Sequence, residues 1–490
     1  MTQLLAIGNA VPAAIAAIPV LDNDAFRRTV LLEIDRGRRL LLLSGVKVAG
    51  DTRLLAALAD DGAGAIHVLA TSVTGSYPAL TPDCPAAHYF EREIHEQCGI
   101  RPDGHPWLKP VRFPHDGPTI EDVEFFQVAG AEIHEVAVGP VHAGVIEPGH
   151  FRFSCHGERV LHLEISLGYQ HRGIEAALRG GPDKRSVLLA ETVAGDTSAG
   201  HATAYCQLIE ALSGTECSPR ATALRVVALE LERIANHIGD LGALAGDVGF
   251  LPAAAYCGRL RGDTLNLTAL LCGSRLGRGC IRPGGVARDV DADTLGELRR
   301  ALADTERDMR NAVDLLWKSS SVRARFENTG ILTRTTAADL GIVGPPARAS
   351  GIDRDCRRDF AGPTYRDHQP FVAVGDSGDV FSRAMQRWLE IDNSLVLLRR
   401  LLDDPGPGSA RVPVGALAPE HLVLSLVEGW RGEIVHLGLT DAAGHLAHYK
   451  IVDPSFRNWF GLAIAMRGQA ISDFPLCNKS FNLSYCGHDL

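Results

Sequence analysis

Eleven cysteines are the residues of this 490-residue chain whose chemistry their spacing constrains most directly. They lie at positions 84, 98, 155, 206, 217, 257, 272, 280, 356, 477 and 486, and no two are separated by only two residues. A cysteine-ligated zinc ribbon, a ferredoxin-type cluster and a thioredoxin-type dithiol all need such close pairs. The odd total also argues against a disulfide framework, so we expect each thiol to be a small buried hydrophobic residue.

Other patterns that could bind ligands are weaker still. The segment GSRLGRGCIRPGGV (residues 273–286) superficially resembles a phosphate loop, but it lacks the Lys-Ser/Thr pair of a P-loop and the spacing of a dinucleotide fingerprint. The 19 histidines include no H-E-x-x-H pattern. The net charge is −10 and no long basic run is present, so we expect no nucleic acid partner.

The elements that would position these residues fall into two parts. At roughly 150 residues per domain, the length allows two or three domains. Residues 1–125 mix strand-like apolar runs with helices: we expect two strands within 29–48, a helix over 51–63, a strand over 65–75 and a short helix near 86–98. A charged stretch then indicates a linker over 126–138.

Residues 139–490 change character. Alternating residues to about 166 predict an antiparallel sheet, and apolar stripes at helical spacing over 221–243, 294–317 and 381–402 predict a helical bundle. Residues 432–453 are typical of a hairpin. The fold class expected from the sequence is therefore α+β: an N-terminal α/β domain, then an antiparallel sheet with a large helical bundle.

The expected compartment is the cytoplasm. The first twenty residues carry no Lys or Arg, so the basic region of a signal peptide is missing, and no stretch reaches 18 uninterrupted apolar residues.

Three segments carry a resemblance to a known family. GPVHAGVIEPGHFRF…LEISLGYQHRGIE and VEGWRGEIVH…YKIVDPSFRNWFGLAIAM resemble the large subunit of energy-converting (group 4) NiFe hydrogenases and the related 49-kDa subunit of respiratory complex I. YPALTPDCPAAHYFEREIHEQCGIRPDGHPWLKP resembles the complex I 30-kDa subunit. The order of the two parts is similar to that of the formate hydrogenlyase type. The resemblance therefore implies a 30-kDa-like domain over 1–125 and a 49-kDa-like domain over 139–490.

Against this resemblance the cysteines are in the wrong places. A NiFe centre needs four thiolates, which the family supplies as two C-x-x-C pairs. The matching positions here are Ala194 and Thr197 in ETVAGDTSAGH, and Ser484 and Gly487 in SFNLSYCGHDL. Cys486 is one residue out of register. We therefore expect this chain to bind no metal and to have no hydrogenase activity.

Some polar residues of the family pattern remain. The resemblance places Glu147 at the proton-relaying carboxylate, Arg431 over the metal site and His150 at a histidine that holds a quinone headgroup, whereas Gly195 stands where the partner tyrosine would be. Glu147, His150 and Arg431 could line one cavity that relays protons or holds an anionic ligand. Equally, they could form a satisfied buried ion pair, whose disruption would cost on the order of 3–5 kcal/mol.

The resemblance implies three competing functions. The first is a metal-free oxidoreductase subunit that couples electron transfer in an adjacent iron–sulfur subunit to an ion-translocating membrane arm. The others are a quinone-reducing subunit with a site rebuilt around His150, and a structural scaffold without a ligand. At the level of the whole complex, NAD binding, quinone binding and proton translocation are implied. The implied partners are a small iron–sulfur subunit, which holds the clusters, a ferredoxin-like subunit and antiporter-like membrane subunits, with this chain peripheral on the inner face of the cell membrane.

Overall fold

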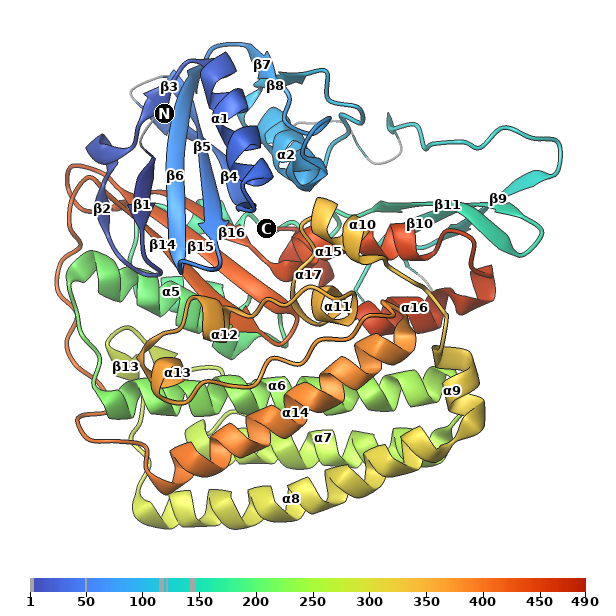
Figure 1. Cartoon of the computed structure of the whole chain (residues 1–490). Helices are drawn as coiled ribbons and strands as arrows, with labels where there is room; N and C mark the ends of the chain where they lie inside the picture. The colour runs from blue at the N-terminus through green and yellow to red at the C-terminus, as the bar shows by residue number, and fades with distance from the viewer. Residues whose placement is uncertain (1–3, 49–50, 114–118, 120–121, 142–146) are drawn as a thin grey trace.

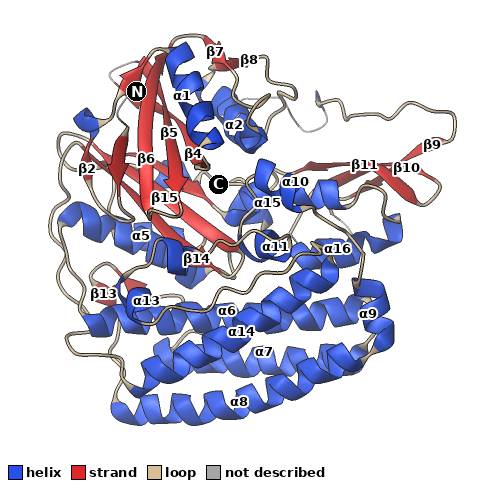
Figure 2. Ribbon diagram, viewed as in Figure 1, coloured by secondary structure: helices blue, strands red, loops and turns tan. Residues whose placement is uncertain are grey.

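The computed structural model describes residues 4–48, 51–113, 119, 122–141 and 147–490, and its mixed architecture confirms the expected α+β class. A sheet with two helices forms the upper part of the molecule in Figure 1, and long helices form the lower part, with a second large sheet between them. Figure 2 shows the same division by secondary structure, with a narrow three-stranded sheet projecting to one side.

The N-terminal part is a five-stranded sheet covered by helices. Its strand order is β1-β6-β5-β4, with β3 pairing parallel to β6. The strands are β1 (Leu5–Ile7), β3 (Val20–Leu21), β4 (Arg39–Val48), β5 (Asp51–Asp60) and β6 (Ala65–Val73), and the helices are α1 (Asn23–Asp35) and α2 (His88–Cys98). A short parallel pair, β7 (Ser76–Pro78) and β8 (Arg101–Asp103), lies beside them.

Two local predictions in this part are wrong. Residues 51–60 form strand β5 and not a helix. This strand is central and its run from Leu54 to Ala59 is buried throughout, so it shows a continuous apolar run without the alternation that marks a half-buried strand. The first of the two strands expected within 29–48 is instead the end of α1, which begins after Asp22, whose side chain accepts a hydrogen bond from the Ala25 amide. The expected strand over 65–75 and helix near 86–98 are confirmed as β6 and α2.

The second part begins with a three-stranded antiparallel sheet in the order β11-β10-β9. Its strands are β9 (Ile133–Val138), β10 (His150–His156) and β11 (Arg159–Ser166). Strand β9 occupies the last six residues of the stretch interpreted as a linker and pairs with β10 along its whole length. The proposed linker therefore contributes a strand to the sheet that follows it.

The helical bundle is built on α6 (Pro219–Asp247), α7 (Leu251–Cys272), α8 (Ala292–Lys318) and α14 (Val380–Asp403), so the three predicted stripes are confirmed inside α6, α8 and α14. Shorter helices surround it: α3 (Ile174–Leu178), α4 (Ser186–Glu191), α5 (Ser198–Ser213), α9 (Ser320–Phe326), α10 (Arg334–Asp339), α11 (Gly344–Ala349), α12 (Cys356–Asp359) and α13 (Pro363–Asp367). A two-stranded ribbon, β12 (Ile281–Arg282) with β13 (Gly285–Val286), follows α7.

The second large sheet joins both ends of the chain. It consists of β14 (His421–Gly429), β15 (Gly432–Thr440) and β16 (Leu446–Val452), followed by α15 (Pro454–Ala465), α16 (Phe474–Phe481) and α17 (Tyr485–His488). Its outer strand is β2 (Ala13–Ala14), which pairs with β14. The N-terminal segment thus completes a sheet that is otherwise built more than 400 residues later, as the hydrogen bond from the Asn9 side-chain amide to the Leu426 carbonyl, 417 residues away, also shows.

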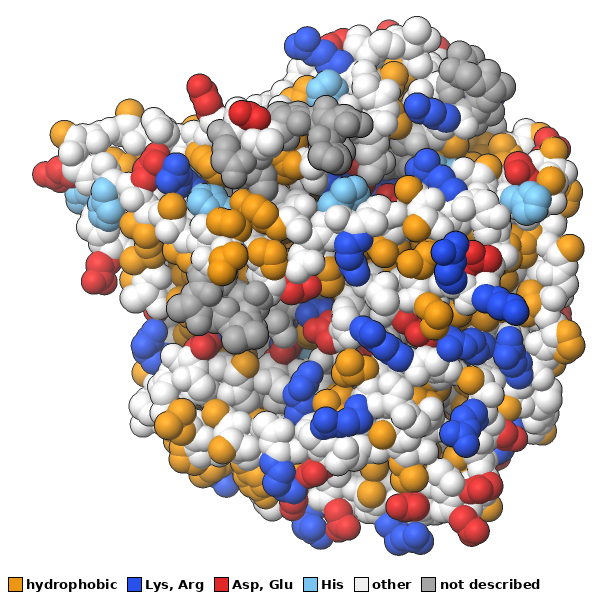
Figure 3. Space-filling model, turned by 180° about the vertical axis from the view of Figure 1, so that it is seen from behind, with side chains coloured by type: hydrophobic (Ala, Val, Ile, Leu, Met, Phe, Trp, Pro, Cys, Tyr) orange, Lys and Arg blue, Asp and Glu red, His pale blue; other side chains and the backbone are white. Residues whose placement is uncertain are grey.

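In the described part of the chain, no helix is long and apolar enough to cross a membrane. Seen from behind, the surface carries Lys and Arg side chains interspersed with Asp, Glu and hydrophobic side chains (Figure 3).

Candidate functional site

Arg431 lies in the tight turn that joins β14 to β15. Gly429 and Gly432 pair across this turn, which leaves Trp430 and Arg431 at its tip. The turn is held from outside by α11, because Gly344 has a φ of +69° and a Cβ there would lie 2.1 Å from the Arg431 carbonyl oxygen. Only glycine fits such a close approach of two backbones. The packing of α11 therefore fixes the position from which the Arg431 side chain projects.

The guanidinium of Arg431 forms a two-pronged ion pair with Asp196. Its two Nη atoms donate to the Asp196 carboxylate oxygens at 2.5 and 2.8 Å, and one of them also donates to the Thr197 hydroxyl at 3.2 Å. Its Nε donates to the Asn482 carbonyl at 2.6 Å. Burial acts to raise the pKa of the Asp196 carboxyl, but Arg431 outweighs it and holds that pKa below its usual value.

A cavity of about 520 Å³ opens beside this ion pair. Glu147 lies on its wall, and the Glu147 carboxylate accepts a hydrogen bond from the Tyr485 amide at 3.3 Å. The polar lining residues are Glu147, Gln170, Asp196, Arg431, Asn478, Lys479, Asn482 and Tyr485. The structure thus brings together two of the three predicted site residues, Glu147 and Arg431.

His150 is not among the residues that line this cavity. Its imidazole packs on Phe125 with ring centres 5.0 Å apart, whereas the next residue, Phe151, packs on Phe474. Successive side chains of a strand point to opposite faces, so His150 at the start of β10 faces away from Phe151. Burial lowers the pKa of His150, and its Nε2 is buried without a hydrogen-bond partner among the described residues.

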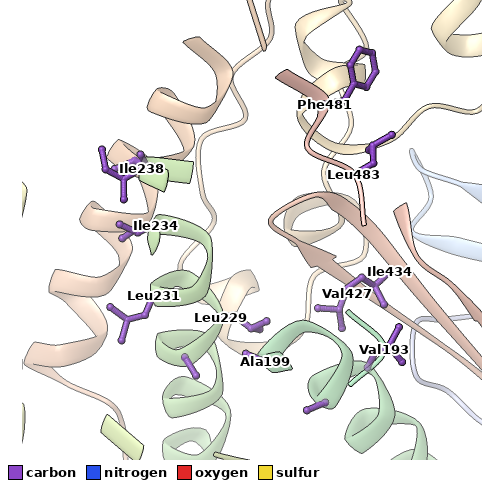
Figure 4. Close-up of a cluster of buried hydrophobic side chains, with 14 of the residues drawn as sticks. Val193, Ala199, Leu229, Leu231, Ile234, Ile238, Val427, Ile434, Phe481 and Leu483 are labelled. Atoms are coloured by element: carbon purple, nitrogen blue, oxygen red, sulfur yellow. The ribbon is translucent and has the colours of Figure 1, made fainter. Parts of the chain in front are cut away.

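The four positions that the resemblance assigns to metal ligands lie in two segments that contact each other. Arg172 ties the segments together by donating to the Val193 carbonyl at 3.1 Å and the Cys486 carbonyl at 3.5 Å. Figure 4 shows buried apolar side chains from the same region, with Val193 and Ala199 of the first segment, Leu483 of the second, and neighbours from α6, β14 and β15. Ala194 and Thr197 are both buried there.

At three of the four positions, the residue present makes close contacts inside the protein. The Thr197 hydroxyl accepts a hydrogen bond from the Trp430 indole at 3.1 Å. The Ser484 side chain caps α17 by accepting from the Gly487 amide at 2.9 Å. A Cβ at Gly487 would lie 2.7–2.9 Å from the atoms of the Asp453 carboxylate, so a cysteine cannot be placed there unless Asp453 moves.

These residue types do not fit a NiFe centre. Two hydroxyl side chains, one alanine and one glycine supply no thiolate, and thiolates are the soft ligands that such a centre requires. The Cys486 thiol is nearby, 3.3 Å from the Ser484 hydroxyl, and burial raises its pKa to about 11. Within the described ranges, no three His, Cys, Asp or Glu side chains gather with the geometry of a metal site.

Asp453, which faces Gly487, starts a buried chain of hydrogen bonds. Its carboxylate lies 3.0 Å from Nε2 of His201, Nδ1 of His201 lies 3.0 Å from Nε2 of His436, and Nδ1 of His436 lies 2.7 Å from the Tyr449 hydroxyl. Burial acts to raise the pKa of Asp453, but the contacts with His201 and the field of Arg431 leave it below its usual value. Burial lowers the pKa of His436 well below its usual value.

Helix α6 presents a stripe of buried charged groups at helical spacing. The stripe consists of Glu230, Arg233, His237 and Asp240, all less than 5% exposed. Glu390 of α14 joins it by contacting Arg233 at 3.2 Å and His237 at 3.0 Å. At the other end, Asp240 pairs with Arg387 at 2.7 Å. Burial raises the pKa of Asp240, with Arg387 acting against it, and the Asp240 carboxylate accepts from Asn482 beside the cavity.

One carboxyl near the site carries a raised pKa. Glu232 is buried, and its oxygens accept hydrogen bonds from the amides of Ala199 and Gly200 at 2.7 and 3.1 Å. Burial raises the pKa of Glu232 to about 8, and these two hydrogen bonds only partly oppose it. Glu232 borders a small cavity together with Asp196.

Sequence reasoning missed several residues of this site. They are Asp196, His201, Glu232, Asp240, Asp453 and Asn482. Asp196 and His201 stand inside ETVAGDTSAGH, the segment that was aligned with the metal ligands, so their polar side chains were the available signal. Asp240 and Glu232 both belong to the buried helix α6, and a buried acid in such a helix is itself a sign of a functional or paired group.

Two family models match the chain. Residues 46–123 match the model described as "Respiratory-chain NADH dehydrogenase, 30 Kd subunit", and residues 247–413 match the model described as "Respiratory-chain NADH dehydrogenase, 49 Kd subunit".

Relatives align with most of the chain. It is 31% identical over 350 residues to carbon monoxide-induced hydrogenase of Rhodospirillum rubrum, an alignment that covers 71% of this chain and 97% of that protein. It is 29% identical over 442 residues to formate hydrogenlyase subunit 5 of Escherichia coli, covering 84% and 76%. It is 28% identical over 388 residues to NADH-quinone oxidoreductase subunit 4 of Thermus thermophilus, covering 74% and 94%.

Proposed function

Because this chain belongs to the family of large subunits shared by complex I and the group 4 hydrogenases, with a 30-kDa-like region fused to a 49-kDa-like one, we propose that it is a metal-free oxidoreductase subunit of a membrane-bound, ion-translocating complex. In this proposal it couples electron transfer from an adjacent iron–sulfur subunit to the membrane arm. NAD binding, where it occurs, belongs to other subunits of the complex.

The observation that carries the metal-free part is the contact between Gly487 and Asp453. A thiolate at position 487 would overlap the Asp453 carboxylate, and Asp453 is held in place by His201 and by the Ser455 amide. At the same time Arg431 and Trp430 both use the Thr197 hydroxyl as an acceptor. The Thr197 hydroxyl and position 487 are thus engaged in contacts that suit the residues present.

The coupling part is supported by the cavity that Glu147, Asp196 and Arg431 share. A carboxylate beside an arginine–carboxylate pair can take up a proton or make room for an anion when the charge of a neighbouring cluster changes. The charged stripe of α6 meets this cavity through Asn482 and Asp240. A scaffold would need only the ion pair and no open, polar cavity beside it.

The quinone-reducing alternative ranks second. One observation favours it: the buried Nε2 of His150 has no partner among the described residues. Because Nδ1 of His150 faces the Gly139 carbonyl at 3.4 Å and so carries the ring proton, Nε2 could accept a hydrogen bond from a quinol hydroxyl. However, His150 does not line the cavity of Arg431, so a quinone held by His150 would need a separate site near Phe125.

Metal analysis of the complex purified with all its subunits tests the first part. We expect iron from the partner subunits but nickel far below one atom per copy of this chain. Formate hydrogenlyase of Escherichia coli, purified in parallel, is the positive control. Nickel at one atom per chain would overturn the proposal.

The coupling role is tested in sealed vesicles that carry the complex. The vesicles receive a reduced ferredoxin and a soluble quinone, and a potential-sensitive dye reports ion movement. We expect Glu147→Gln to slow the dye response by about tenfold or more if Glu147 transfers protons, whereas Glu158→Gln, in the exposed turn between β10 and β11, leaves it unchanged. An unchanged response of a fully assembled Glu147→Gln complex would favour the scaffold.

A further inference from the structure

Two thiols outside the site lie close together at the end of α7. Cys272 is the last residue of α7, and Cys280 follows a loop of seven residues. Both line the same small cavity, together with Leu224, Val286 and Arg288, and their side chains interact directly. The sequence alone does not indicate this pair, because the two cysteines are separated by seven residues and such a spacing matches no recognised dithiol motif.

The chain between the two thiols is built to turn back on itself. Gly273, Gly277 and Gly279 all have positive φ, at +83°, +69° and +80°. Backbone hydrogen bonds from Gly277 to Ser274 and from Cys280 to Gly277 close two successive turns. These glycines permit a conformation that other residues would resist, and the turns return Cys280 to the end of the helix.

The two thiols differ in their surroundings. Cys272 is partly exposed, whereas Cys280 is 5% exposed. The contact with Cys280 is the main reason why the pKa of Cys272 is lowered to about 7, and the Ser274 backbone and Arg288 act in the same direction against burial. The same contact, with burial, raises the pKa of Cys280. Cys272 is therefore the attacking thiolate and Cys280 the resolving thiol.

We propose that Cys272 and Cys280 form an oxidation site, at which hydrogen peroxide converts the two thiols into an intramolecular disulfide. The Cys272 sulfur attacks one peroxide oxygen, the O–O bond breaks, and the other oxygen leaves as water after protonation. The Cys280 sulfur then attacks the resulting sulfenic acid, the S–S bond forms, and the hydroxyl leaves as a second water with the Cys280 proton. Two thiols and one peroxide give one disulfide and two waters, so the balance is complete.

The loop that the disulfide would close contacts the candidate site. The Gly279 amide donates to Glu191 at 2.8 Å, at the end of α4 and three residues before Ala194. Arg275 and Gly277 border the small cavity that also contains Asp196 and Glu232. Oxidation would fix this loop against the segment that carries Asp196. The inference rests on the thiols alone and does not depend on the proposed function.

Peptide mapping of the full chain, purified with its accompanying subunits, tests the proposal. Trypsin separates the two cysteines, because Arg275 and Arg278 lie between them. After brief treatment with hydrogen peroxide and alkylation of free thiols, we expect peptide 262–275 joined to peptide 279–288, and loss of that species after reduction. Cys272→Ser and Cys280→Ser should each abolish it, whereas Cys217→Ser, at another partly exposed cysteine, should leave it unchanged.

The rate of alkylation provides a second measurement that does not need the disulfide. A thiol with a pKa of about 7 should react only about twofold faster at pH 9 than at pH 7, whereas an ordinary thiol gains roughly 25- to 50-fold over that interval. We expect the alkylation rate of Cys272 to rise only about twofold from pH 7 to pH 9 in the wild type, and to rise much more in Cys280→Ser. Conversion of Cys272 to sulfinic acid without a linked peptide, or a rise in the alkylation rate of Cys272 equal to that of Cys217, would overturn the proposal.

Discussion

Glu232 couples the region of the site to pH through a single buried proton. Its carboxyl has a pKa of about 8 in the fold, against about 4.5 for an unperturbed glutamate, so the folded chain holds a proton that the unfolded chain releases. The contribution of this proton to the free energy of unfolding is fully present below about pH 4.5 and is lost as the pH rises to about 8. Between these two pH values, the free energy of unfolding should fall by roughly 1.4 kcal/mol per pH unit through this group.

We predict that Glu232→Gln removes this slope. Glutamine keeps an oxygen acceptor for the Ala199 or Gly200 amide but does not titrate. The measurement is urea unfolding of wild type and variant at half-unit steps from pH 5 to 8. The difference between their stabilities should grow steadily with pH, and a difference that stays constant would contradict the assigned pKa.

At the residue scale, long motifs drew sequence reasoning to Arg431 and Glu147, and both side chains line one cavity in the structure. Sequence reasoning could not separate His150 from them. That separation depends on the pleat of β10, which turns His150 and Phe151 to opposite faces. It also could not foresee that Asp196 neutralises Arg431, since this contact joins residues 235 positions apart.

Strand β15 connects the two parts of the molecule through one buried ion pair. Glu433 accepts hydrogen bonds from both Nη atoms of Arg39 in β4, and the two side chains are only 2% and 10% exposed. Burial acts to raise the pKa of Glu433, but Arg39 outweighs it and keeps Glu433 ionised. Removal of the Glu433 charge would leave Arg39 with Asp61, at 2.9 Å, as its acidic partner, and Asp61 is 24% exposed.

We predict that Glu433→Gln lowers the free energy of unfolding by about 3 kcal/mol, the lower end of the usual cost of breaking a buried pair, because Asp61 still contacts Arg39. Asp83→Asn is the matched control, because the Arg27–Asp83 pair lies at the surface, with Asp83 55% exposed, and such pairs contribute at most about 1 kcal/mol. Urea unfolding followed by tryptophan fluorescence checks both. Equal effects of the two substitutions would show that Glu433 does not link the parts.

At the element scale, the long amphipathic helices of the bundle were predictable because one face of each is apolar and the other polar. Strand β5 was not, since it is covered on both sides and its neighbours, and not its own sequence, decide its conformation. The end of α1 was mistaken for a strand because Val30, Leu31 and Leu32 form a short apolar run, and such runs suit either conformation.

The two parts of the molecule share one hydrophobic core. Leucines and valines on β14 and β15 belong to the same hydrophobic core as the N-terminal sheet: Leu422, Leu424, Leu426, Val435, Leu437 and Leu439. Buried polar contacts also cross between the parts, such as those of Lys450 with Glu93 at 2.6 Å and of Ser44 with His448 at 3.0 Å.

We predict that residues 139–490 expressed alone are insoluble and that co-expression with residues 1–138 restores a soluble pair. The lone fragment would expose the apolar face of β14 and β15, leave the β14 edge unpaired and lack β9, the partner of β10. Size-exclusion chromatography of the two cultures checks this. A soluble, monomeric 139–490 fragment would contradict it.

The pairing of β2 with β14 also sets an order of events during synthesis. Ala13 and Ala14 leave the ribosome before their partners Leu422 and His421, which follow only after the whole helical bundle has been made. Strand β2 therefore lacks its partner while the bundle helices are made and fold around their local contacts. Closing the second sheet is therefore a late step, and a ribosome that stalls before residue 421 leaves β2 without the strand that it pairs with.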